Sequence, residues 1–243
     1  HGMNESIARL STGMRAMYGA DAAGHSMGKS IQAVGASYAQ ASRNIEDGIS
    51  YAQMGESVLL EVANLGSRLR ELGIAYDNAA LLDANQEAAL DAEAALIGDT
   101  IQNIIDTTDF NTVEVVDSNT ATQKAIAYGS LTANTTSVGP NVQIAVTNTI
   151  TTADAADTAA DTLLGKVAEG LGNIAADLTA LKAFQGAASA TGANMAAAGA
   201  RLIDTDFALE TASLTKNAIL NQAALAMAAQ ANAAQSSILS VLQ

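Results

Sequence analysis

Residues 220–243 read LNQAALAMAAQANAAQSSILSVLQ, and this stretch decides what kind of fold the chain adopts. It predicts an alanine-rich helix whose remaining faces carry polar but uncharged side chains. One apolar seam runs along it in alternating steps of four and three residues, the spacing of a coiled coil. The seam consists of Leu220, Ala224, Met227, Ala231, Ala234, Ile238 and Val241. Such a helix buries little by itself, so the pattern favours assembly with other helices over catalysis.

The same spacing predicts three more long helices upstream. Apolar residues recur about every 3.5 residues between Ile31 and Tyr76, the period of a left-handed coiled coil. We expect a turn at residues 78–85, in which Asp83 is the N-cap and Gln86 its return partner. A second helix, antiparallel to the first, carries a stripe of Leu90, Ala94, Ile97, Ile101 and Ile104. A third carries apolar residues from position 164 to 202 and breaks at Asp204 or Thr205.

Residues 110–152 change character and predict a small β-rich insert. Residues 113–116 and 142–146 are expected strands, separated by a turn at Gly139, Pro140 and Asn141. The expected fold is mainly α, with long heptad-patterned antiparallel helices forming a rod and the insert between its N- and C-terminal halves. The corresponding parts are an N-terminal helical part at 1–110, the insert at 111–162, a core helix at 163–203 and an assembly helix at 204–243.

Composition excludes several classes of protein. Only 3% of the residues are aromatic and there is no Trp, although 49% are hydrophobic, which favours long, closely packed helices over a core with a large pocket. The formal net charge of −14 argues against nucleic-acid binding, since phosphate contacts need clustered Lys and Arg. Without cysteine the chain forms no disulfide or thiolate metal site. It has no run of 18 apolar residues that would indicate a membrane span.

No group of residues indicates catalysis, a metal site or a cofactor. His25 has no obvious partner ligand, so a solvated histidine is the simpler interpretation. Asp154, Asp157 and Asp161 lie on one helical face and could hold Ca²⁺ weakly, but negative charge near a helix start is the better explanation. Asp106 and Asp109 are interpreted in the same way. The glycines follow no phosphate-loop spacing. We therefore expect a protein that is not an enzyme.

Short motifs at both ends of the chain resemble bacterial flagellin. They occur in the family's order and cover roughly residues 4–117 and 165–243. The motifs are LSTGMR at 10–15, DAAG at 21–24, QASRN at 40–44, DGIS at 47–50, RLREL at 68–72, Phe110-Asn111, Asp204-Thr205-Asp206 and AQANAAQSSILSVLQ at 229–243. The sequence departs from the family with Thr112 in place of a glycine, Gln235 in place of a common proline, and a stretch from Arg15 to Gly24 that is one residue shorter. We also expect the family's first helix to be missing. His1, Gly2 and Met3 are expected to be an extraneous remnant.

The resemblance implies a filament subunit that assembles for motility. In flagellins the two terminal helices pair and line the inner tube of the filament. Residues 220–243 are therefore expected to be loose in solution or to find a substitute partner in a crystal. Their assembly residues are Leu220, Met227, Ile238 and Val241. The implied partners are identical subunits, hook-associated proteins and an export chaperone at the C-terminal helix. The implied location is the extracellular flagellum at the cell surface, reached by the flagellar type III system.

Residues 68–72 have two interpretations. Arg68 and Glu71 can pair on an exposed helix face while Leu69 and Leu72 turn inward, which alone accounts for these residue types. The resemblance implies in addition a contact between subunits, and it leaves open recognition by an innate immune receptor.

Two other functions stay open at this stage. A hook–filament junction protein shares the helical architecture, although the C-terminal motif favours the filament subunit. The other is a cell-surface ligand-binding protein, for example one for a polysaccharide, built on a flagellin scaffold. The sequence offers no obvious aromatic platform for such a ligand, and Lys124, Lys166 and Lys182 are the candidate cations.

Overall fold

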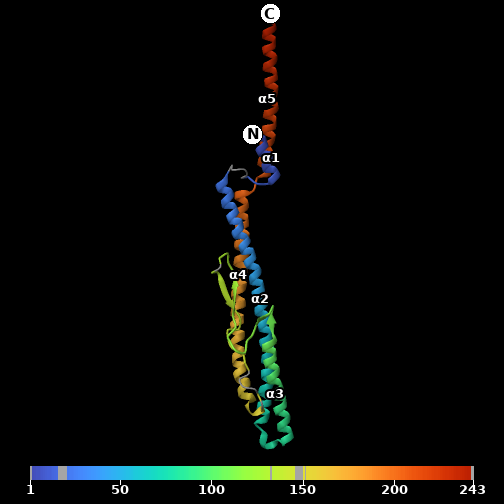
Figure 1. The fold of residues 1–243 in the computed structure, drawn as a ribbon, viewed down its shortest axis with the longest axis vertical. Coiled ribbons are helices and arrows are strands. Elements are labelled where there is room, and N and C mark those ends of the chain that lie inside the picture. The colour runs from blue at the N-terminus through green and yellow to red at the C-terminus, as the bar shows by residue number, and fades with distance from the viewer. Residues whose placement is uncertain (1, 16–20, 132, 146–149, 151, 242–243) are drawn as a thin grey trace. The chain divides into compact units, whose positions relative to one another are not determined.

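The computed structural model describes residues 2–15, 21–131, 133–145, 150 and 152–241, the last four of them as backbone only. Its helices are α1 (Gly2–Thr12), α2 (Ala22–Tyr76), α3 (Ala84–Thr107), α4 (Ala156–Ile203) and α5 (Phe207–Val241), with 3-10 turns η1 (Ala79–Leu81) and η2 (Ala153–Ala155). Helices α2 and α4 are 55 and 48 residues long. Neither contains a proline, which is one reason why the heptad pattern continues uninterrupted. The mainly α fold expected from the sequence is confirmed (Figure 1).

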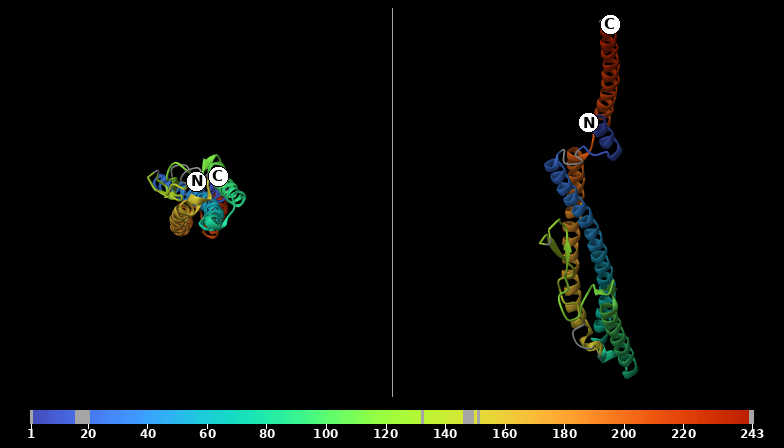
Figure 2. Two further views of the ribbon diagram at one scale, coloured as in Figure 1. Left: turned by 90° about the horizontal axis from the view of Figure 1, so that it is seen from below. Right: turned by 45° about the horizontal axis from the view of Figure 1, so that its top comes forward.

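The chain divides into two compact units, the first formed by residues 1–36 and 192–243 and the second by residues 37–191. In the second unit α2, α3 and α4 lie side by side (Figures 1 and 2). Their heptad stripes meet in one core, in which Ile45, Leu59, Leu69, Ile101 and Leu181 are fully buried. The pattern from Ile31 to Tyr76 therefore marks a packing face between helices, as hydrophobic periodicity usually does.

The turn between α2 and α3 is fixed by the capping box that the sequence predicts. The Asp83 carboxylate accepts hydrogen bonds from the backbone N–H groups of Asn85 and Gln86, at 2.8 and 2.9 Å. The Gln86 side chain in turn accepts one from the Asp83 backbone N–H at 3.0 Å. Because these three N–H groups are satisfied, α3 begins at a defined residue and the turn before it is held in place.

The β-rich insert differs from the prediction in its strands. Its two antiparallel pairs are β1 (Asp109–Phe110) with β2 (Val113–Glu114), and β3 (Lys124–Ala127) with β4 (Thr135–Val138). The strand predicted at 142–146 is wrong for its described residues 142–145. Val142 and Ile144 are buried against the helices without any strand partner, so their alternation reflects burial and not sheet pairing. Position 146 and most of the threonine-rich stretch 147–152 lie outside the described residues.

In the first unit, two motifs from opposite ends of the sequence hold each other. Gly13 ends α1 with φ of +68°, and its carbonyl accepts a hydrogen bond from the Thr205 N–H at 2.9 Å. The Arg15 guanidinium donates to the Leu202 carbonyl at 3.1 Å. Asp206 caps α5 by accepting from the Ala208 N–H at 2.9 Å. The LSTGMR and Asp204-Thr205-Asp206 motifs thus shape the junction between α4 and α5. Helix α4 ends at Ile203, where the sequence predicts a break.

Helix α1 lies against the beginning of α5 (Figure 1). Arg9 forms an ion pair of 3.6 Å with the largely buried Glu210, and Ser6 is buried between the two helices. Gly2 lies next to Asn217. Gly2 and Met3, expected to be an extraneous remnant, are part of this helix. These contacts lie in the first three turns of α5, before residues 220–243, so the expectation that this last segment is loose stays a prediction.

Gly73 allows a close approach between α2 and the backbone of α4. A Cβ built at this position would overlap the backbone of Asp157, lying 2.9 Å from its Cα. We expect Gly73→Ala to lower the free energy of unfolding by about 1–3 kcal/mol, because overpacking outweighs the gain in helix propensity. Gly165→Ala is the matched control, since nothing lies within 4 Å of its Cβ, and it should stabilise by up to about 1 kcal/mol. Urea unfolding measures both, and equal stabilisation by the two variants would contradict the close approach.

Asp177 makes the stability of the second unit depend on pH. Its carboxylate accepts a hydrogen bond from the Gly139 N–H at 2.9 Å, but partial burial outweighs this bond and raises the pKa of Asp177 above its ordinary value. A raised carboxyl pKa means that the folded state binds the proton more tightly than the unfolded state does. The free energy of unfolding, relative to that of Asp177→Asn, should therefore increase as the pH falls through the acidic range. A difference between the two chains that stays flat with pH in urea titrations would contradict this prediction.

Candidate assembly surfaces

The outer part of α5 exposes nearly all of its apolar surface. Every described side chain from 219 to 237 is exposed, including Leu220 (55%) and Met227 (67%) of the predicted seam. Ile219 and Leu225, 60% and 66% exposed, lie off that seam. The side chains of Ile238 and Val241 are outside the described residues. The apolar surface is therefore not one narrow stripe, and a helix that is apolar on several sides is typical of a site enclosed by other helices.

This surface carries no charge. Lys216 is the last charged residue of the sequence, so residues 217–243 hold no Asp, Glu, Lys or Arg although the chain has a net charge of −14. Copies of α5 that approach one another therefore meet neither Coulomb repulsion nor salt-bridge specificity. The small alanine side chains let helix backbones approach closely. The chemistry of this surface suits helix packing.

The segment 68–72 forms an exposed charged surface above a buried base. Arg68 pairs with Glu71 at 3.1 Å, as the sequence predicts, and also with Glu93 of α3 at 2.7 Å, which sequence spacing did not reveal. The Arg68 guanidinium donates hydrogen bonds to the carboxylates of Glu93 and Glu71, and these bonds, that to Glu93 first, raise the pKa of Arg68 further above its ordinary value. Leu69 and Leu72 are 0% and 3% exposed. Because both leucines are buried within the chain, only Arg68, Arg70 and Glu71 are exposed for an outside partner.

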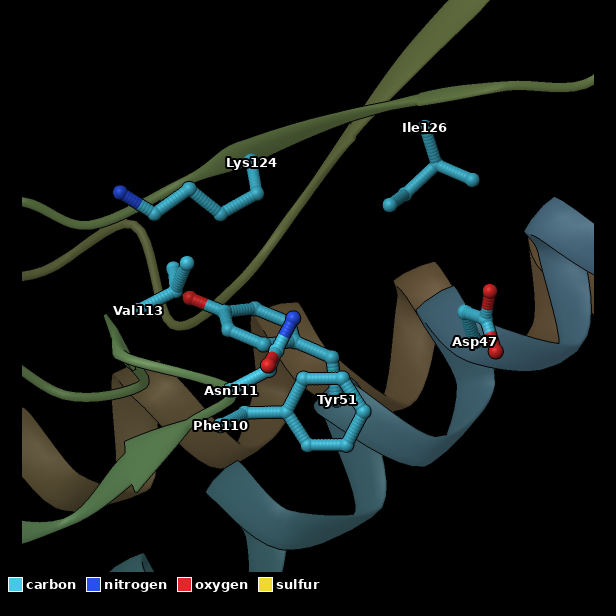
Figure 3. Close-up of a pocket in the computed structure, with 7 residues that line it drawn as sticks. All are labelled: Asp47, Tyr51, Phe110, Asn111, Val113, Lys124 and Ile126. Atoms are coloured by element: carbon cyan, nitrogen blue, oxygen red, sulfur yellow. The ribbon is translucent and has the colours of Figure 1, made fainter.

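A cavity of about 510 Å³ lies in the second unit, where the hairpin β1–β2 and strand β3 face α2 (Figure 3). The Tyr51 and Phe110 rings meet edge to face with centroids 6.0 Å apart. The Tyr51 hydroxyl donates to the Glu114 carbonyl at 3.0 Å, and burial raises the pKa of Tyr51 to about 12. The other lining residues are Asp47, Asn111, Val113, Lys124 and Ile126. Sequence analysis missed this cavity, because its aromatic residues are 59 positions apart in a chain with few aromatics.

The other candidate residues fall into structural roles. Asp161 pairs with Arg70 at 2.7 Å, Asp157 accepts from the Thr158 N–H, and Asp106 accepts from the Ser118 hydroxyl at 3.0 Å. Within the described part of the chain, no three or more His, Asp or Glu side chains are grouped so that they could hold a metal ion. Of the candidate cations, Lys166 pairs with Glu169 at 3.5 Å. In the described ranges no helix has the length and apolar character of a membrane span.

Comparison with known proteins agrees with the motifs. The family model for the bacterial flagellin N-terminal helical region matches residues 1–121, and that for the C-terminal helical region matches residues 150–242. A flagellin of Halalkalibacterium halodurans is 32% identical, over 98% of this chain and 91% of its own length. A flagellin of Bacillus subtilis is 30% identical, over 98% and 92%. A flagellar filament core protein of Brachyspira hyodysenteriae is 27% identical, over 99% and 92%.

The β1–β2 turn beside the cavity is strained at Thr112. Asn111 and Thr112 have φ of +51° and +64°, as the two-residue hairpin turn requires, but a β-branched residue is disfavoured there. We expect Thr112→Gly to raise the free energy of unfolding by roughly 0.5–1 kcal/mol. Asn111→Gly is the control and should gain less, because Asn already tolerates this conformation. Thermal unfolding compares the two, and a loss of stability in Thr112→Gly would contradict the assigned strain.

Proposed function

This chain belongs to the bacterial flagellin family and is a structural subunit of the flagellar filament, and on that premise we propose that α5 and the exposed side of residues 68–72 are its contacts with identical subunits. The family is one of structural proteins, which agrees with the packing roles of the candidate residues. The family also implies an extracellular filament reached through the flagellar export system. We infer this location, through the type III route, for the present chain.

The observation that supports α5 as the principal contact is its uncharged, exposed apolar surface. Complete burial of one Leu or Met side chain is worth about 1.5–3 kcal/mol. Burial of Leu220, Leu225 and Met227 against neighbouring copies would together offset much of the entropy lost when a free helix is fixed in place. Among the residues that the structure describes, α1 covers only the beginning of α5, and the side chains from 219 to 237 are exposed. Assembly is the state in which this helix buries its surface.

The charged surface at 68–72 supports a second, weaker contact. Arg68 is held by two carboxylates from two helices, so its guanidinium is ordered before any partner binds. A preordered group loses less entropy on binding. Leu69 and Leu72 contribute here by anchoring the helix and not by touching a neighbour, since they are buried. The same exposed groups are the ones an innate immune receptor would contact on a free subunit.

The remaining partners follow from the family. We propose that the exposed α5 surface binds an export chaperone before secretion. Inside the cell, an exposed apolar surface without charges would otherwise associate unspecifically with other proteins. Hook-associated proteins at the two ends of the filament would meet the same surface. These partners are helical proteins that offer complementary apolar faces.

Polymerisation of the chain under salting-out conditions tests the main proposal. We expect the unmodified chain to form filaments that sediment and are visible by negative-stain electron microscopy. Met227→Asp should reduce the sedimented fraction at least tenfold, because it buries an unpaired charge in the contact. Its circular dichroism should be unchanged, since the Met227 side chain is 67% exposed in the single chain.

The control replaces another exposed methionine, outside α5, with aspartate. Met27 of α2 is 60% exposed, and Met27→Asp should still form filaments. Arg68→Ala should polymerise with a raised critical concentration. Normal filaments from Met227→Asp, or none from the unmodified chain, would overturn the proposed role of α5.

A further inference from the structure

Methionine sulfur is the main group of this chain that can react with oxidants. The sequence holds seven methionines and neither cysteine nor Trp. Of the methionines that the structure describes, Met27 and Met227 have exposed side chains, at 60% and 67%. The other described methionines are partly buried, namely Met3, Met14, Met54 and Met195. An oxidant in solution therefore reaches Met27 and Met227 more easily than the rest.

Met227 differs from Met27 in its surroundings. It lies within residues 219–237 of α5, where every described side chain is exposed, whereas Met27 lies in α2. Side chains one helical turn away are the ones that can cover a helix residue. For Met227 these are Ala223, Ala224, Gln230 and Ala231. Three of the four are alanines, which are too short to cover the sulfur and have no hydrogen-bond donor to offer it.

We propose that Met227 is an oxidation site at which hydrogen peroxide controls whether a free subunit can join a filament. The sulfur lone pair attacks one peroxide oxygen, the O–O bond breaks, and the other oxygen leaves as water with both hydrogens. The thioether is thereby oxidised to a sulfoxide and the peroxide is reduced. This inference rests on the proposed function, because the oxidation state of Met227 affects assembly only if neighbouring copies cover α5.

The sulfoxide makes this part of α5 costly to cover. Its oxygen is a polar hydrogen-bond acceptor that water satisfies in the free subunit, and an apolar helix face would remove that water. Polymerisation of the oxidised chain should therefore need a protein concentration about tenfold higher. The modification is reversible, since a methionine sulfoxide reductase with a dithiol as electron donor returns the thioether and releases water. In a filament the same cover keeps peroxide away from the sulfur.

Peptide mapping after limited peroxide treatment tests the site without reference to assembly. Trypsin cleaves after Lys and Arg, so residues 217–243 leave as one peptide whose single methionine is Met227. Residues 44–68 form another, whose single methionine is Met54, partly buried against the helical core. In the soluble full chain we expect the first peptide to gain one oxygen atom several times faster than the second. Equal rates for the two peptides would overturn the assignment of Met227.

Polymerisation before and after the same treatment tests the consequence. The measured quantity is the ratio of the critical concentrations of treated and untreated samples of one chain, so each variant is compared only with itself. For the unmodified chain we expect a ratio of about ten, and the reductase with a dithiol should reverse the increase. In Met227→Leu the increase should disappear, because no sulfur remains on this surface. The matched control Met27→Leu should keep it.

The outcomes distinguish the two proposals. If the chain polymerises equally well with Met227 reduced and oxidised, control by oxidation is overturned and the role of α5 as a contact stays intact. An increase that persists in Met227→Leu comes from another methionine and also overturns this inference. If the untreated chain forms no filaments, the assembly proposal fails, and control of assembly by Met227 fails with it, whatever the peptide map shows.

Discussion

The structure depends on apolar helix surface that a single chain cannot bury. In the second unit, α2, α3 and α4 bury their heptad stripes against one another, with Ile45, Leu69 and Ile101 fully enclosed. In the first unit, α1 covers only the beginning of α5, and the helix beyond it has every described side chain exposed. The same physical driving force thus stabilises a folded part within the chain and favours the cover that we propose other copies provide for α5.

Charge is distributed in a way that suits this division. The excess of acidic residues lies outside the last 27 positions, which carry no charge at all. Negative charge keeps free subunits soluble and apart, whereas the uncharged helix lets them pack once they meet. The exposed ion pairs at Arg68 add little stability by themselves, because water screens them. These ion pairs instead hold the Arg68 guanidinium in one position.

Much of the fold follows from the sequence because its signals are local. The capping box at Asp83 and Gln86, the break after Ile203 and the ion pair of Arg68 with Glu71 depend on residues within a few positions of each other, and all are observed. The strands of the β-rich insert were harder to predict from the sequence. Val142 and Ile144 alternate like a strand but pack on helices. The true strands at Lys124–Ala127 and Thr135–Val138 are only four residues long, and the second is mainly polar, so neither gives a strong signal.

The sequence by itself determined the family, the helical class and the uncharged C-terminal helix, because motifs and periodicity are properties of neighbouring residues. Only the tertiary structure decided which distant groups meet. In it Arg68 forms an ion pair with Glu93, and the Gly13 carbonyl accepts a hydrogen bond from the Thr205 N–H. The Tyr51 and Phe110 rings meet edge to face and line a cavity. It also showed that α1 covers the start of α5. Such contacts depend on how long helices turn back on one another, and no local pattern encodes that path.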